Sequence, residues 1–404
     1  MARSKIHVGL EIGTSKVCMV VGEVRSDGSI KILGLGQTRS AGIRRGEIVD
    51  FPQARACVKE AMLKAEDAAD VEIRSVLLSV TGNHIRGVNN RGTFRLPDSE
   101  STIGPGHVEE VREIARDLQI PREHVYLHHI VRHYLVDGQM HSNSPQGLAG
   151  RTLECDFHVV HCMRSRIENS IRCVREIPID VDDVVFAPLA SAQVALHRDA
   201  KERGALVIDI GAGTTDYIFY QEGSVTACGC IPVGGDHITN DIHLVTGLPW
   251  SKAEKVKIDE GDASGDPARS VGSIRIPADQ GFAEATISRE LLNDVIRTRI
   301  EETLALVRQQ LPEGALQHLG SGVYLTGGTS QMHGCGELIH HLFDCAIYRS
   351  EGPDVSGSHA LFKDPRYSTV VGLIRYAQLM DPDLRQSPGG LLSRMGHMFW
   401  PFSR

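Results

Sequence analysis

Residues 6–21, IHVGLEIGTSKVCMVV, and residues 205–220, ALVIDIGAGTTDYIFY, share one pattern. Each begins with an apolar, β-branched run, reaches an acidic residue, turns through glycine and hydroxyl residues, and continues as a second apolar run. Such runs flanking a short glycine turn predict two strands joined by a hairpin. The recurrence of the pattern some 200 residues later predicts a chain built from two related halves.

The two turns have the composition of phosphate-binding loops. Glycine lets the backbone approach a ligand closely, and tight turns aim several N–H groups at phosphate oxygens. The predicted phosphate-binding residues are Gly13, Thr14, Ser15 and Lys16 in the first turn and Gly211, Gly213, Thr214 and Thr215 in the second. Glu11 and Asp209 end the preceding strands, where carboxylates hold magnesium, usually through its waters. One glycine hairpin is more often structural, but two in the same context favour a site for ATP and Mg²⁺.

Two further glycine clusters are predicted to approach the adenosine. They are Gly327-Gly328-Thr329, which follows an apolar strand, and Gly234-Gly235-Asp236, which precedes a helix. Glu254 and Lys257 lie three residues apart on one face of a predicted helix, where they can reach a ribose or base edge. The spacing fits a solvated ion pair equally well, so both interpretations stay open.

Composition limits the other possibilities. The chain has 404 residues, 41% of them hydrophobic, and a formal charge of −8. This length allows several compact units, and the acidic balance argues against general nucleic-acid binding. The nine cysteines form no CxxC pair, which disfavours a zinc ribbon or a redox dithiol. No signal peptide and no apolar run of the roughly 20 residues that a spanning helix needs is visible.

Two segments interrupt the strand pattern. From residue 86 onward, turn-rich sequence, an amphipathic helix at about 106–119 and two strands around 124–136 predict a small inserted subdomain, with an exposed loop at 137–151. Residues 231–310 predict a second, helical insertion that ends in one long helix from Leu291 to Gln310.

The C-terminal region predicts a linker at 381–390 and an amphipathic helix at 391–404. The helix is expected to place large apolar residues against a lipid bilayer surface: Leu391, Leu392, Met395, Met398, Phe399 and Trp400. Packing of this helix on the protein's own core is the alternative.

Beyond the hairpins, further motifs match one family in order. They are GIRRGEIVD at 42–50, TGNHI at 81–85, VYLTGGTSQMHG at 323–334 and YSTVVGL at 367–373. With the hairpins they resemble the actin-like ATPase superfamily and, within it, the bacterial cell division family FtsA, over nearly the whole chain. The resemblance implies an α/β, two-lobed actin-like ATPase fold with a small α+β subdomain inserted in the first lobe.

The resemblance also implies the domains and partners. The first-lobe core is 1–85 with 164–200, the inserted SHS2-like interaction subdomain is 86–163, the second-lobe core is 201–230 with 305–380, and the helical subdomain is 231–304. The inserted subdomain would serve self-association into filaments and contacts with later division proteins. The helical subdomain would dock the acidic C-terminal peptide of FtsZ through Arg289, Arg297 and Arg299, although these arginines equally suit a solvated helix.

The chain departs from related sequences in two places, one that concerns ATP hydrolysis and one that concerns the contacts of the insertion. In chaperones and kinases of the superfamily, the segment matching FAPLASA at 186–192 carries an acid or amide that orients the attacking water, and here Ala187 and its neighbours supply none. We therefore expect no catalytic residue and slow hydrolysis, with ATP acting mainly as a structural ligand. In the 137–151 loop, Ser144-Pro145 replaces the usual Asp-Pro, which leaves the contacts of the insertion open.

The expected function is a peripheral protein of the cytoplasmic face of the bacterial inner membrane, at the division site, that tethers FtsZ filaments. A pilus-assembly scaffold of the PilM type is the alternative, and the amphipathic C-terminal helix argues against it. A sugar or acetate kinase is less favoured because no catalytic acid faces a substrate cleft.

Overall fold

A computed structural model describes residues 5–25, 29–141, 144–279, 281–349, 355–356 and 363–380. The first lobe is built on a six-stranded sheet of order β11-β6-β1-β2-β3-β19. Its strands are β1 (Lys5–Ile12), β2 (Lys16–Val24), β3 (Ile30–Arg39), β6 (Ser75–Val80), β11 (Asp180–Phe186) and β19 (Val355–Ser356). β1, β2 and β3 form an antiparallel meander. β6 pairs in parallel with β1, and β11 pairs in parallel with β6.

The second lobe repeats this topology. Its five-stranded sheet has the order β14-β13-β12-β17-β18, with β12 (Ala205–Ile210), β13 (Thr215–Gln221), β14 (Ser224–Ile231), β17 (Val323–Thr326) and β18 (Ile347–Arg349). Again three strands, β12, β13 and β14, form an antiparallel meander. β17 pairs in parallel with β12, and β18 pairs in parallel with β17. The repeated hairpin in the sequence is therefore one part of a duplicated sheet.

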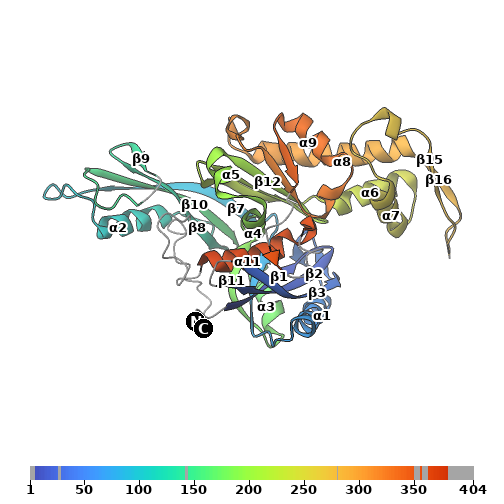
Figure 1. Cartoon of the computed structure of the whole chain (residues 1–404), viewed down its shortest axis with the longest axis horizontal. Coiled ribbons are helices and arrows are strands. Elements are labelled where there is room, and N and C mark those ends of the chain that lie inside the picture. The colour runs from blue at the N-terminus through green and yellow to red at the C-terminus, as the bar shows by residue number, and fades with distance from the viewer. Residues whose placement is uncertain are drawn as a thin grey trace.

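Helices cover the sheets and connect the lobes (Figure 1). α1 (Phe51–Ala69) begins at Asp50, whose carboxylate accepts a hydrogen bond from the Gln53 amide, and packs on β3 so closely that a Cβ on Gly36 would collide with the Ala61 carbonyl. α3 (Arg164–Arg175) also belongs to the first lobe. α4 (Ala187–Ala195), α5 (Arg198–Arg203) and α11 (Ser368–Met380) lie near the junction of the lobes. α11 packs on α4, β1 and β2, so it completes the first-lobe core although it follows the second-lobe strands in sequence.

The inserted subdomain is a four-stranded sheet with a helix on one face. It comprises β7 (Ile85–Arg95), α2 (Pro105–Arg116), β8 (His124–Val136), β9 (Gln139–His141) and β10 (Thr152–Met163), and the sheet order is β7-β10-β8-β9. Where we expected two strands around 124–136, one long strand continues, because bulges in its pairing with β10 absorb the change of register.

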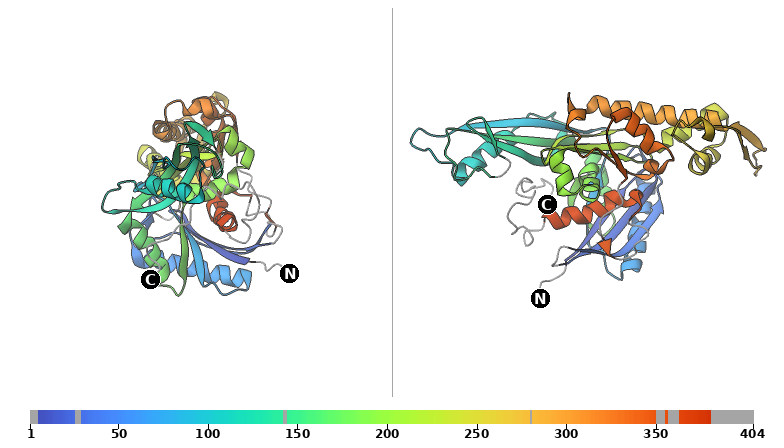
Figure 2. Two further views of the ribbon diagram at one scale, coloured as in Figure 1. Left: turned by 90° about the vertical axis from the view of Figure 1, so that its left-hand side faces the viewer. Right: turned by 45° about the horizontal axis from the view of Figure 1, so that its top comes forward.

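The second insertion projects from the opposite end of the molecule (Figures 1 and 2). It holds α6 (Gly235–Thr246), α7 (Trp250–Glu260) and α8 (Arg289–Gln310). It also holds a hairpin of β15 (Ser273–Ile276) and β16 (Ala285–Ser288), which the helical expectation missed because four-residue strands carry little periodicity. α9 (Cys335–Phe343) packs beside α8. Among the described residues, no helix is long and apolar enough to cross a membrane. The predicted linker and amphipathic helix at 381–404 lie outside the described residues.

Candidate nucleotide site

The two glycine turns have the same hydrogen bond and face each other. The Gly13 amide donates to the Lys16 carbonyl at 3.0 Å, and the Gly211 amide donates to the Thr214 carbonyl at 2.9 Å. Gly213 lies so close to Thr14 of the other turn that any Cβ there would collide with the threonine side chain. The duplicated fold therefore brings two loops of phosphate-binding composition, one from each lobe, to a single place.

Acidic side chains gather at the base of these turns. Lys16 Nζ lies 3.3 Å from Glu11 Oε2, and the Thr369 hydroxyl donates to Asp209 Oδ2 at 3.1 Å. Burial, followed by the charges of Asp216 and Glu11, raises the pKa of Asp209 to about 8. Burial likewise raises the pKa of Asp216 to about 6.

This cluster favours a cation. Several carboxylates held away from water repel one another unless positive charge is supplied. Within the described residues, no three His, Cys, Asp or Glu side chains form a metal centre by themselves. Glu11 and Asp209 supply carboxylate oxygens that would suit Mg²⁺ held through waters and ligand phosphates, as this ion commonly is.

The second-lobe glycine clusters converge on the same turn. The Gly235 amide and the Thr329 hydroxyl both donate to the Gly211 carbonyl, at 2.9 and 3.0 Å. Gly327 has φ of +86° and contacts Asp209 so closely that a side chain there would collide with the carboxylate. The glycine clusters at 234–236 and 327–329, which are distant in sequence, thus form one wall of the site beside the two glycine turns.

Glu254 and Lys257 belong to this wall and are not a solvated pair. Lys257 is buried, and its Nζ contacts Glu254 Oε2 at 2.6 Å, Thr239 Oγ1 at 2.8 Å and the Gly235 carbonyl at 3.0 Å. Asp236 lies nearby, and burial, partly offset by Lys257, raises its pKa. Lys257 therefore supports the backbone at Gly235, while Glu254 is only partly buried.

A cavity of about 500 Å³ lies beside the first turn, and apart from Ser15 and Lys16 its lining residues were not predicted as site residues. Its lining residues are Ser15, Lys16, Gln37, Thr38, Arg39, Lys64, Arg366 and Tyr367. The Tyr367 ring lies 5.3 Å from Lys16 Nζ, and Arg366 packs against Gly328. Tyr367 opens the motif YSTVVGL, but nothing in that motif by itself indicates that these side chains adjoin the glycine turns.

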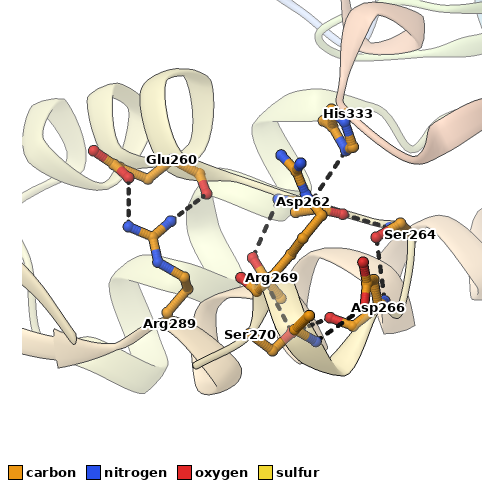
Figure 3. Close-up of polar contacts among 10 residues, drawn as sticks. Glu260, Asp262, Ser264, Asp266, Arg269, Ser270, Arg289 and His333 are labelled. Atoms are coloured by element: carbon orange, nitrogen blue, oxygen red, sulfur yellow. Dashed lines mark hydrogen bonds and ion pairs between the residues drawn. The ribbon is translucent and has the colours of Figure 1, made fainter. Parts of the chain in front are cut away.

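The three predicted partner-binding arginines do not form one patch. Arg299 contacts Asp241 of α6 through Oδ2 at 2.5 Å, and Arg297 pairs along α8 with Glu301 at 2.8 Å. Two residues apart on a helix, these side chains diverge by about 200°. Arg289 instead contacts Glu260 Oε2 at 2.8 Å (Figure 3).

Beside Arg289, a polar network anchors the loop that follows α7 (Figure 3). The buried Asp262 carboxylate accepts from Arg269, from His333 Nδ1 at 3.0 Å and from the Ser264 amide at 2.7 Å. Together with the contact of Arg289 and Glu260, this network connects α8 to the segment that follows Gly327-Gly328-Thr329.

The α4 segment begins where the two lobes are joined in sequence. Ala187 is buried at the start of α4. The amide side chain of this helix, Gln193, donates to the Leu189 carbonyl at 3.0 Å and accepts from Lys201 Nζ at 3.0 Å. Both polar atoms of the Gln193 side chain are therefore engaged in contacts within the protein.

The duplicated sheets, the facing turns and the insertion define an actin-like fold, and known structures agree. The chain is similar to the PilM-PilN type IV pilus biogenesis complex, with a TM-score of 0.64 and 16% identity over 92% of this chain and 98% of that one. It is also similar to MreB5 of Spiroplasma citri bound to ADP, with a TM-score of 0.57 and 14% identity over 95% and 99%. The predicted fold class is thereby confirmed.

Sequence comparison identifies the family. The family model for cell division protein FtsA matches residues 206–372, and the model for the SHS2 domain inserted in FtsA matches 82–161. Cell division protein FtsA of Pseudomonas aeruginosa is 35% identical over 92% of this chain and 89% of its own length. The Neisseria meningitidis protein is 32% identical over 96% of both. The chain belongs to the FtsA family of cell division proteins.

Proposed function

We propose that this protein binds ATP with Mg²⁺ between its facing glycine turns and polymerises as an actin-like filament. The observation that carries the proposal is the meeting of the two turns, with Glu11 and Asp209 at their base and the glycine wall beside them. A triphosphate needs many N–H donors and a cation at one place, and this arrangement supplies both. The structure of a relative bound to ADP supports the choice of ligand.

We further propose that the filament tethers FtsZ to the cytoplasmic face of the inner membrane and recruits later division proteins through the inserted subdomain. Membership of the FtsA family supports this role. The decisive experiment is binding of the FtsZ C-terminal peptide to the purified protein. Absence of binding at any attainable concentration would exclude the tethering role.

The α8 arginines make this test specific. Arg299, on the side of α8 that faces α6, is the proposed contact for an acidic peptide, because charge complementarity there directs binding. Arg299→Ala should weaken peptide binding about tenfold, the loss of one charge-assisted hydrogen bond, as measured by fluorescence anisotropy. Arg297→Ala, on another side of the same helix, is the matched control. Equal effects of the two substitutions would contradict the assignment.

Hydrolysis should be slow. α4 presents no acid or free amide to position water, and phosphoryl transfer depends on that positioning. We expect phosphate release far below the roughly 1–100 per second typical of kinases, with ATP instead stabilising the fold. Turnover in that range in a phosphate-release assay would overturn this expectation.

A further inference from the structure

The motif GIRRGEIVD at 42–50 forms a small turn against both glycine turns. β4 (Ile43–Arg44) pairs with β5 (Glu47–Ile48), and the Gly42 carbonyl accepts from the Val49 and Asp50 amides at 2.8 and 3.0 Å. At the tip, the Gly46 amide donates to Thr14 Oγ1 at 3.0 Å. The tip is thus hydrogen-bonded directly to the first phosphate turn.

The same tip also touches the second lobe. A Cβ on Gly46 would lie 2.7 Å from Thr81 Cγ2 and 3.5 Å from Thr214 Cγ2, and Thr214 belongs to the second turn. The tip therefore lies where the two lobes meet, hydrogen-bonded to the first lobe and beside Thr214 of the second.

Arg45 occupies the tip in an uncommon backbone conformation. Its φ is +51°, a left-handed value that costs a non-glycine residue energy and concentrates at functional sites. The Arg45 side chain is exposed, and no carboxylate pairs with it in the part of the chain that the structure describes. Glycine adopts this left-handed conformation without strain. The presence of arginine at this position therefore suggests a role for its side chain.

The charge of Arg45 reaches toward the second lobe. His237, in the first turn of α6, accepts from the Gly234 amide at 3.1 Å. Burial lowers the pKa of His237, and the positive charge of Arg45 adds to this effect. The positive charge of Arg45 is thus near enough to the second lobe to act on His237, as is that of Arg299.

The direction in which a nucleotide would extend follows from where the glycine clusters and the Gly46 tip each meet the second turn. The adenosine glycines meet the second turn at the Gly211 carbonyl, whereas Gly46 meets it at Thr214. A nucleotide whose adenosine lies against residues 327–329 extends its phosphates toward Thr14 and Thr214. Its terminal phosphate then lies nearest the tip that carries Arg45.

We propose that Arg45 binds the terminal phosphate of the nucleotide and thereby makes the site prefer a triphosphate to a diphosphate. This inference rests on the proposed binding of ATP between the turns. A guanidinium forms charge-assisted, often bidentate, hydrogen bonds to phosphate oxygens, and one held at the junction of the lobes makes them only when that phosphate is present.

The experiment compares the affinities of Mg-ATP and Mg-ADP for the full-length protein by isothermal titration calorimetry. Arg45→Gln should weaken ATP binding about tenfold or more and ADP binding less than about threefold, since only the triphosphate loses a charged hydrogen bond. Arg45→Lys should restore part of the ATP affinity. Arg44→Gln removes the neighbouring exposed arginine of β4 and is the matched control, with both affinities expected to equal those of the wild type.

The outcomes separate this inference from the proposed function. No nucleotide binding by the wild type refutes the nucleotide site as a whole. Wild-type binding with an ATP-to-ADP ratio unchanged in Arg45→Gln refutes the role of Arg45 alone, as does an equal loss in Arg44→Gln. Because Arg45 is exposed, misfolding is not expected. Arg45→Gly, which relaxes the left-handed backbone, provides a second variant that must show the same selective loss.

Discussion

Replacing Asp209 by asparagine should stabilise the nucleotide-free protein and, at the same time, abolish its binding of Mg-ATP. Asp209 is the penultimate residue of β12 and lies beside Gly327 and near Glu11 and Asp216. Burial, Asp216 and Glu11 together raise its pKa to about 8. In the unfolded chain the same carboxyl titrates near its ordinary value of about 4.

The sign of the effect follows from this difference. A carboxyl whose folded pKa exceeds its unfolded pKa binds protons more tightly in the folded state, so it costs stability as the pH rises from about 4 to about 8. Asparagine keeps the shape and removes the charge. The gain in free energy of unfolding should be between about 1 and 2 kcal/mol near pH 5 and should grow to about 5 kcal/mol at pH 8.

The binding loss arises from the same charge. Mg²⁺ prefers carboxylate and water oxygens, and an amide supplies no negative charge to the ion. Mg-ATP should therefore raise the melting temperature of the wild type, as any ligand specific for the folded state does, and leave that of Asp209→Asn unchanged.

Urea unfolding at several pH values and calorimetric titration with Mg-ATP test both halves of this prediction. Asp294→Asn, which alters an exposed carboxylate of α8, is the matched control and should change neither quantity. If Asp209→Asn binds Mg-ATP like the wild type, the carboxylate is not on the magnesium side of the site. If its stability gain does not grow with pH, the acidic cluster carries no unfavourable charge.

The local sequence pattern predicted each glycine turn of this site but not the contact between the two turns. The hairpins at 13–16 and 211–214 follow from apolar runs and glycine turns, because short-range sequence determines such features. Their contact depends on how the two lobes pack together. The approach of Thr329 to Gly211 depends on parallel pairing of β12 and β17, which are far apart in sequence. The spacing of Glu254 and Lys257 likewise fitted two interpretations until burial of Lys257 separated them.

Residues outside the glycine turns were missed for a different reason. Arg45 lies in a polar turn, where arginine is common. Only the neighbouring Gly46, which donates to Thr14 and lies beside Thr214, places it at the site. By contrast, the divergence of Arg297 and Arg299 follows from helix geometry alone, so the sequence already contained evidence against one shared arginine patch.

Deleting residues 389–404 should abolish cosedimentation with lipid vesicles and leave ATP binding unchanged. The predicted amphipathic helix lies outside the described residues, so its composition carries the argument. Insertion of its apolar face into the headgroup boundary supplies on the order of a few kcal/mol, which is marginal and reversible for one molecule. Filament formation raises the effective affinity because many helices bind one surface. Wild-type binding should therefore rise steeply with protein concentration.

Stability distinguishes membrane binding from the alternative, in which this helix packs on the protein's own core. A packed helix contributes buried apolar area, and its removal should lower the free energy of unfolding by roughly 2–5 kcal/mol. A helix reserved for the membrane contributes almost nothing to folding in solution. We therefore expect unchanged urea unfolding in the deletion variant, and the same loss of vesicle binding in Phe399→Glu but not in Ser393→Glu, a polar residue of the same segment. Retained cosedimentation after deletion would place the membrane contact elsewhere, and a destabilised deletion variant would favour the packed helix.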